Sequence, residues 1–104
     1  MDKQSVKIAK EFAKKLKRKF DIQKLLLFGS RARGDNLKNS DFDFIIVSND
    51  FKKKPFILRA SDLYDYWDHP VDIEPLCYTP KEFERKKKQI GIVKTATEEG
   101  IEIV

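Results

Sequence analysis

Apolar residues in the first twenty positions recur every three or four residues, the spacing of one face of an α-helix. Lysines occupy most of the positions between them, so the other faces of such a helix are basic. The apolar stripe consists of Val6, Ala9, Ala13, Leu16 and Phe20. The pattern predicts an amphipathic helix at the start of the chain, with its apolar face packed on a core.

Two apolar segments follow, and each has the length of a strand. Residues 25–28 form a continuous apolar run bounded by polar or small residues, which is typical of a fully buried strand. Residues 41–47 carry apolar side chains on both faces beyond Asp43, which indicates a central strand covered on both sides. Residues 29–40 are small, polar and basic, so we expect a turn, a short helix and a loop there.

The second half continues the alternation of helix and strand. Apolar residues between 57 and 67 predict a second amphipathic helix, which ends before Pro70. Residues 71–75 predict a third strand, residues 79–82 have the pattern of a capping box at a helix start, and residues 100–104 predict a short last strand. The order predicts an α/β or α+β fold around a small sheet.

Length and composition narrow the class of protein. The chain has 104 residues with 40% hydrophobic residues, and we expect residues 1–104 to form a single domain. No apolar run approaches the roughly 20 residues that span a bilayer. A single cysteine cannot form an internal disulfide, which favours a reducing compartment. We therefore expect a cytoplasmic protein that does not interact with a membrane.

The formal charge of +5 is unevenly distributed. Residues 1–20 contain eight basic and two acidic residues, whereas the rest of the chain is close to neutral. Such a run is usually a solvated helix face, and this is the interpretation we favour. The alternative is a surface that attracts RNA, an anionic substrate or an acidic partner.

Candidate chemistry begins at Gly29 and Ser30, which lie after a buried strand and before the expected short helix. Glycine lets the backbone turn sharply and approach a ligand closely. Amide groups of the following turn and the serine hydroxyl can then bind phosphate. Arg31 and Arg33 are candidate phosphate partners, or alternatively they form surface ion pairs, with Asp35 as an obvious partner for such a pair.

Asp41 and Asp43 lie two residues apart at the start of a strand, so both carboxylates project from one face. Two carboxylates this close repel unless a cation holds both, and their oxygens suit Mg²⁺ or Mn²⁺. Asp72, near the start of another strand, is a candidate third acid. It would complete a second metal site or take the proton of an attacking hydroxyl. Glu74 shares its face and competes for that role.

The paired motif, in which ten residues separate Gly29 and Ser30 from Asp41 and Asp43, resembles the signature of the polymerase-beta-like nucleotidyltransferase superfamily. The residues around the two motifs resemble its smallest branch, the minimal nucleotidyltransferases or MNT proteins. This resemblance implies a small mixed sheet flanked by helices, one or two Mg²⁺ ions, and a nucleoside triphosphate that is commonly ATP. The reaction would move a nucleotidyl group onto an acceptor hydroxyl and release pyrophosphate.

The motif match also implies roles for individual residues. Asp41 and Asp43 would bind metal, and Asp72 would be the third acid of the catalytic and metal site. The nucleotide would be held by Gly29, Ser30, Arg31 and Arg33.

A partner protein is a further implication of the resemblance. Many MNT proteins act as antitoxins beside a HEPN-domain RNase toxin, and some adenylylate a tyrosine of that toxin. We therefore expect a protein adenylyltransferase with a HEPN toxin as its partner. One alternative is an antitoxin that only occludes its partner, and a less favoured one is transfer to RNA or a small molecule. Because 104 residues leave little room for an acceptor pocket, another copy of the chain or another protein would hold the acceptor.

Two further residues have unremarkable expected roles. His69 stands alone before a proline and is expected to be a loop residue. Cys77 has no second cysteine or histidine close in sequence, so we expect a small packed hydrophobic side chain.

Overall fold

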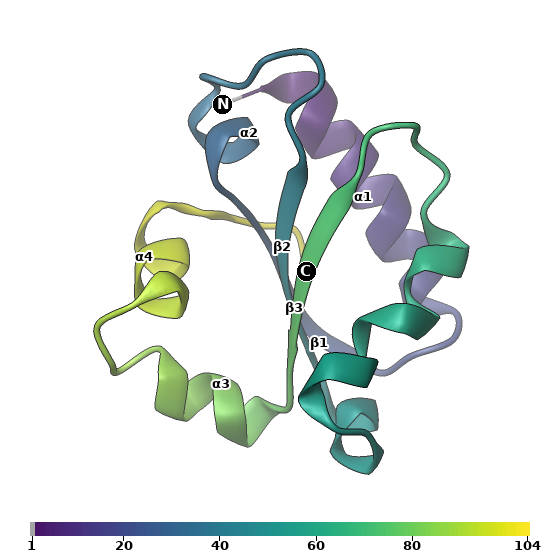
Figure 1. Cartoon of the computed structure of the whole chain (residues 1–104), viewed down its shortest axis with the longest axis vertical. Helices are drawn as coiled ribbons and strands as arrows, with labels where there is room; N and C mark the ends of the chain where they lie inside the picture. Colours follow the sequence, from purple (N-terminus) through teal and green to yellow (C-terminus); the bar gives the residue numbers. More distant parts are fainter. Residues whose placement is uncertain (1) are drawn as a thin grey trace.

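Four strands form one mixed sheet in the order β3-β2-β1-β4 (Figure 1). The strands are β1 (Ile22–Phe28), β2 (Phe42–Ser48), β3 (Ile73–Tyr78) and β4 (Ile101–Glu102). β1 runs antiparallel to both β2 and β4, whereas β2 and β3 are parallel. The structure, a computed structural model, describes residues 2–104. It confirms the α/β class and the small mixed sheet flanked by helices.

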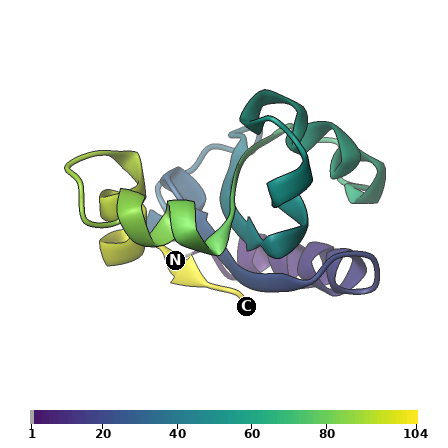
Figure 2. The same cartoon turned by 90° about the horizontal axis from the view of Figure 1, so that it is seen from below.

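Helices and short turns cover both faces of the sheet. The helix α1 (Lys3–Lys17) and the turns between β2 and β3 lie against one face, and α3 (Pro80–Lys86) and α4 (Ile92–Glu99) lie against the other (Figure 2). The short helix α2 (Ser30–Arg33) follows β1. No helix within residues 2–104 is both long and apolar enough to cross a membrane.

The strand β2 is buried on both faces, as its sequence pattern predicts. Phe44 and Ile46 belong to the core formed with α1, and Ile45 and Val47 belong to the core formed with α3 and α4. These four side chains are at most 2% exposed. The only side chain of β2 that is not fully buried is Asp43, which lies near the beginning of the strand.

The first helix is confirmed, with its lysines on the solvent side and Ala9, Ala13 and Leu16 in the core. The helix ends before Phe20, which packs partly against the core from the loop that follows. The capping box at Thr79 is also confirmed, since its side chain accepts from the Glu82 amide and the Glu82 side chain accepts from the Thr79 amide.

The predicted amphipathic helix over residues 57–67 is wrong. The chain forms three 3₁₀ turns instead, η2 (Phe56–Leu58), η3 (Ala60–Asp62) and η4 (Tyr64–Tyr66), preceded by η1 (Asn49–Lys53). In this region the side chains that pack on the core are those of Ala60, Leu63, Tyr66 and Trp67. The first three are spaced by three residues, which matches the 3₁₀ repeat, and Trp67 follows η4 in extended backbone.

Pairing between strands also moves several predicted boundaries. β1 begins three residues earlier than predicted because Ile22 pairs with Ser48 across the antiparallel ladder. The third strand begins two residues later, at Ile73, and continues to Tyr78 beside β2. Two helices rather than one separate β3 from β4, and each contributes buried side chains to the same core face.

Candidate functional site

The turn after β1 brings Gly29 against the side chain of Asp43. Gly29 has a φ of 77°, and a Cβ at this position would lie 2.3 Å from Oδ2 of Asp43. Any other residue would therefore be strained in its backbone and would collide with the carboxylate. The turn predicted to hold phosphate and the second aspartate of the motif are thus direct neighbours.

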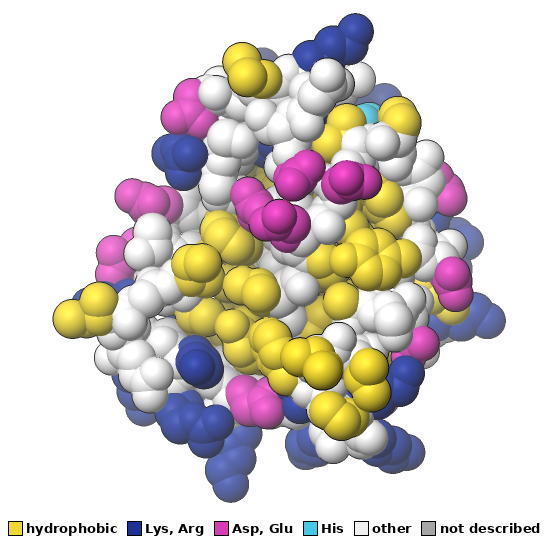
Figure 3. Space-filling model, viewed as in Figure 1, with side chains coloured by type: hydrophobic (Ala, Val, Ile, Leu, Met, Phe, Trp, Pro, Cys, Tyr) yellow, Lys and Arg dark blue, Asp and Glu magenta, His cyan; other side chains and the backbone are white. Residues whose placement is uncertain are grey.

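Four carboxylates gather where the parallel strands β2 and β3 begin. In this ladder Asp43 is paired with Glu74, and the amide of Phe42 donates to the carbonyl of Asp72 at 3.0 Å. Asp41 immediately precedes β2 and is exposed. Figure 3 shows acidic side chains gathered above a largely apolar surface on this side of the molecule. Neighbouring parallel strands therefore assemble the acids that lie about thirty residues apart in sequence.

Burial and the neighbouring acids alter the protonation of Asp43. The pKa of Asp43 rises to about 6, first because burial penalises its charge, and then because of the charge and hydrogen bond of Glu74 and the charge of Asp41. Arg33 acts in the opposite direction and lowers this pKa. The site thus concentrates more negative charge than its own surroundings neutralise.

A groove of about 430 Å³ borders the cluster along the outer edge of β3. Asp41, Asp72 and Glu74 all line it, together with aromatic side chains from the η4 region. Because β3 is the edge strand and Gly29 follows β1, the groove and the glycine turn lie on opposite sides of the acids. The structure brings both candidates for the third acid, Asp72 and Glu74, to this groove.

The donor set suits a divalent cation held jointly with a ligand. Among residues 2–104, no group of three or more histidine, cysteine, aspartate or glutamate side chains has the arrangement of a metal site on its own. Mg²⁺ is usually held by one or two carboxylates plus the phosphates of a bound substrate, rather than by a cage made only of protein. Neighbouring carboxylates beside the Gly29 turn, where we expect phosphate to bind, fit that mode.

The two arginines of the motif have different surroundings. Arg33 is exposed, forms an ion pair with Asp35 at 3.2 Å, and acts electrostatically on Asp43. Arg31 is buried, and its guanidinium donates to the carbonyls of Ser40 and Lys38 and to the hydroxyl of Ser5. This geometry does not favour the predicted phosphate-binding role of Arg31, because all three nitrogens of its guanidinium donate within the protein, and that role stays a prediction.

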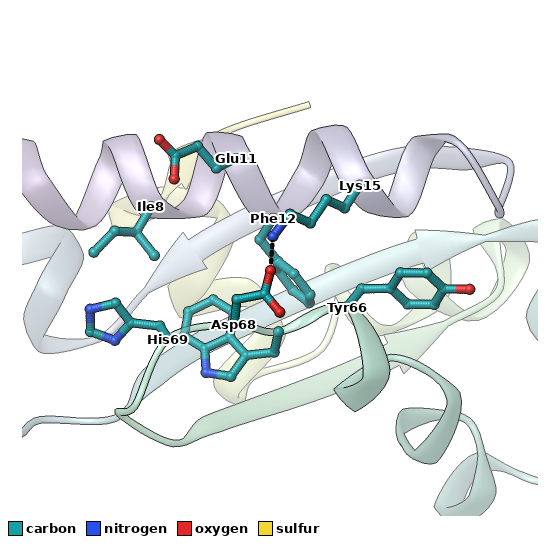
Figure 4. A pocket seen from close by; sticks show the side chains of 8 residues that line it. Ile8, Glu11, Phe12, Lys15, Tyr66, Asp68 and His69 are labelled. Carbon is teal, nitrogen blue, oxygen red and sulfur yellow. Dashed lines mark hydrogen bonds and ion pairs between the residues drawn. The ribbon is translucent and has the colours of Figure 1, made fainter.

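A second cavity lies between α1 and residues 66–69 (Figure 4), and it shares Trp67 and His69 with the groove beside the acids. It measures about 120 Å³, and an ion pair between Lys15 and Asp68 crosses it. His69, which borders it, accepts from the Val71 amide through Nδ1 and packs against the ring of Phe42. These contacts agree with its expected place in a loop.

Cys77 packs as a small hydrophobic side chain, as predicted. It is 2% exposed in the core, and burial raises the pKa of its thiol to about 12. A thiol in this state is a poor nucleophile at neutral pH.

Residues 9–103 match the family described as the nucleotidyltransferase domain. The chain belongs to this family. The match includes every site residue considered above and confirms the resemblance to the nucleotidyltransferases that the two motifs carry.

Three curated proteins of Methanocaldococcus jannaschii, each named "Putative protein adenylyltransferase", are similar to this nucleotidyltransferase domain. One is 31% identical over 76% of the chain and 58% of its own length, and a second is 30% identical over 64% and 74%. A third is 49% identical over 41% of the chain and 45% of its own length. The chain thus spans little more than half the length of the first of these relatives.

A solved structure is also similar. The crystal structure of a "putative nucleotidyltransferase" from Sulfolobus solfataricus aligns with a TM-score of 0.63 and 29% identity, covering 79% of this chain and 73% of that one. The fold expected from the motifs is therefore shared with a member of the same class of enzyme.

Proposed function

We propose that residues 1–104 form a single nucleotidyltransferase domain that transfers AMP from ATP, with Mg²⁺, to a hydroxyl group of a partner protein. The observation that carries this proposal is the contact between the Gly29 turn and the carboxylate of Asp43. It places a candidate phosphate-binding turn directly against a candidate metal ligand. Membership of the nucleotidyltransferase family supports the same reaction class.

Each group has a role that follows from its position. Gly29 and Ser30, with the exposed Arg33 nearby, would hold the triphosphate, and Asp41 and Asp43 would hold Mg²⁺. When bound, Mg²⁺ supplies neutralisation of charge on the triphosphate. Burial, together with repulsion by Glu74 and Asp41, raises the pKa of Asp43, so the ionised carboxylate is disfavoured without a counter-charge and a bound cation would stabilise it.

The proposed transfer forms one bond and breaks another. The acceptor oxygen bonds to the α-phosphorus of ATP while the bond from that phosphorus to the pyrophosphate oxygen breaks, and pyrophosphate leaves. The hydroxyl proton passes to a carboxylate on the groove side of the cluster, either Asp72 or Glu74. Both are exposed, so an acceptor that enters from the groove reaches them.

The acceptor in this proposal is a HEPN-domain toxin, which AMP transfer would inactivate, so that the domain acts as an antitoxin. Two observations favour a macromolecular acceptor. The groove beside the acids is open, and three relatives carry the name of protein adenylyltransferases.

The test is transfer of label from α-³²P-ATP in the presence of Mg²⁺, using the purified chain and a HEPN protein encoded beside it. Label on the partner is expected, and it should disappear with Asp43→Asn. Asp65→Asn is the matched control, since Asp65 is an exposed aspartate outside the acid cluster, and this variant should label as the wild type does.

Other results would redirect the proposal. A stable, toxin-neutralising complex that carries no label would indicate an antitoxin that acts by occlusion. Label on RNA in place of protein, with binding that weakens steeply as salt rises, would identify a nucleic-acid acceptor.

A further inference from the structure

Arg31 lies next to the Gly29 turn, where we expect phosphate to bind, yet its side chain is buried. It lies in α2, one residue after Ser30, and is 5% exposed. A buried guanidinium is costly unless each of its donors finds a partner. The partners of Arg31 therefore show what the protein gains by burying this charge.

Two of these partners are backbone carbonyls in the loop that leads into β2. Nε donates to the carbonyl of Ser40 at 2.8 Å, and Nη2 donates to that of Lys38 at 3.1 Å. Asp41 is the next residue after Ser40. One side of the guanidinium therefore fixes the backbone immediately before the first aspartate of the motif.

The face of the guanidinium contacts the residue between the two aspartates. Its central carbon, Cζ, lies 4.1 Å from the ring centroid of Phe42, within the range of a cation–π interaction. Phe42 is fully buried, so its ring is a fixed support. The backbone between Asp41 and Asp43 is thereby held by Arg31 from two directions.

The third nitrogen of the guanidinium connects Arg31 to the first helix, α1. Nη1 donates to the hydroxyl of Ser5 at 2.9 Å, and the same hydroxyl donates to the carboxylate of Asp2. Asp2 itself lies 3.7 Å from Nη1. Arg31 thus connects the start of α1, the Gly29 turn and the loop before Asp41.

We infer that Arg31 is a positioning residue, which sets Asp41 and Asp43 relative to the Gly29 turn without touching the substrate. The inference rests on the proposed nucleotidyl transfer for its catalytic meaning. Lysine does not replace arginine here, because a single ammonium group lacks the rigid fork that reaches three separate acceptors. We call these contacts of Arg31, which connect the Gly29 turn with the loop before Asp41, the Arg31 brace.

Arg31→Lys tests this inference, with the exposed Arg18→Lys as the matched control. At 25 °C, Arg31→Lys should lower kcat at least tenfold while changing the KM for ATP less than twofold. Arg18→Lys should change neither constant. A residue that only stabilises the fold would lower the melting temperature and leave kcat of the folded protein unchanged, and that result would overturn the inference.

A change in the KM for ATP without a change in kcat would also overturn it, since Arg31 would then bind the triphosphate. Should Arg31→Lys fail to fold, Ser5→Ala removes one partner of Nη1 from a buried position and should lower kcat two- to fivefold. An unchanged kcat in a folded Ser5→Ala protein would count against the brace.

Hydrogen exchange separates this inference from the proposed function. In Arg31→Lys the amides of residues 40–42 should exchange at least tenfold faster, whereas those in the middle of β1 should not change. This readout needs no activity. A wild-type chain that transfers no nucleotide would refute the proposed function, and unchanged exchange at residues 40–42 would refute the brace.

Discussion

Two buried arginines hold different regions of this molecule, one beside the acids and one beside α3. Arg31 and Arg59 are 5% and 6% exposed, and each donates to two backbone carbonyls. Each also has an aromatic ring nearby, Phe42 at 4.1 Å and Phe56 at 5.8 Å. The two arginines are therefore alike in their burial, in their carbonyl acceptors and in having an aromatic neighbour.

The carboxylate partners make the difference. Arg59 forms a forked pair with Glu82, and this pair lowers the pKa of Glu82 to about 2. Arg31 has a carboxylate only at 3.7 Å, and its donors go mainly to the loop before Asp41. A forked ion pair ties two packed segments together and stabilises the fold, whereas bonds to a loop backbone fix the direction of the residues that follow. We therefore expect Arg59 to contribute mainly to the stability of the fold, and Arg31 mainly to the positions of Asp41 and Asp43.

The largest effect is expected from Asp43→Asn in the region of Arg31. Removing this carboxylate takes away a candidate metal ligand, so the initial rate of nucleotide transfer should fall at least about 100-fold. The melting temperature at pH 8 should not fall, because the change also removes a crowded charge. A variant that retains more than a tenth of the wild-type rate would contradict the proposal that nucleotide transfer takes place at the acid cluster where β2 and β3 begin.

Glu82→Gln should have the opposite signature in the region of Arg59. It leaves a buried guanidinium without its counter-charge, and we expect a loss of about 2–3 kcal/mol of unfolding free energy, just below the range for fully buried pairs because Glu82 is 30% exposed. Urea unfolding measures this loss. The kcat of the folded protein at 25 °C should be unchanged, and a tenfold decrease would erase the distinction between the two arginines.

Gly29→Ala changes only the turn beside Asp43 and should mainly affect stability. The positive φ and the predicted collision with Asp43 should together cost about 1–3 kcal/mol of stability. In an Asp43→Ala background, which removes the colliding oxygen, the cost should shrink toward the contribution of the backbone alone. Equal costs in the two backgrounds, measured by urea unfolding, would show that Gly29 and Asp43 are not in contact.

The two regions should also respond to pH in opposite directions. Because the pKa of Asp43 is about 6 in the folded protein and near 3.8 without the fold, its contribution to stability declines as the pH rises from about 4 to above 6. Glu82 has a lowered pKa, so its contribution is full above about 4.5 and is lost as the pH falls toward 2. Melting curves with a chelator present should show Asp43→Asn gaining on the wild type between pH 4 and 7, and Glu82→Gln losing its disadvantage below pH 4.

The smallest effect is expected from the ion pair across the second cavity. Lys15→Met should change the unfolding free energy by less than about 1 kcal/mol, because both Lys15 and Asp68 are well exposed to solvent. Transfer activity should stay at the wild-type level. A clear loss of activity would mean that the cavity between α1 and residues 66–69 belongs to the working surface.

Prediction from sequence succeeded where a local rule acts alone. The periodicity of α1, the capping box at Thr79, the double burial of β2 and the need for glycine at position 29 are all visible in short stretches of sequence. It failed over residues 57–67, where the apolar spacing fitted two helix types and packing against the sheet selected the 3₁₀ turns. Position along the chain also could not separate Arg31 from Arg33, which differ in burial and in their hydrogen-bond partners.

The family and the chemical groups of the candidate site can be predicted from the amino-acid sequence, because Gly29, Ser30, Asp41 and Asp43 lie within one short segment and their spacing is recognisable there. The pairing of Glu74 with Asp43 and the inward orientation of Arg31 could not be predicted, because they depend on the folded chain. The first depends on the register of β3 against β2, and the second on the meeting of α1, α2 and the loop before β2. Both are contacts between distant segments, and such contacts exist only once the chain has folded.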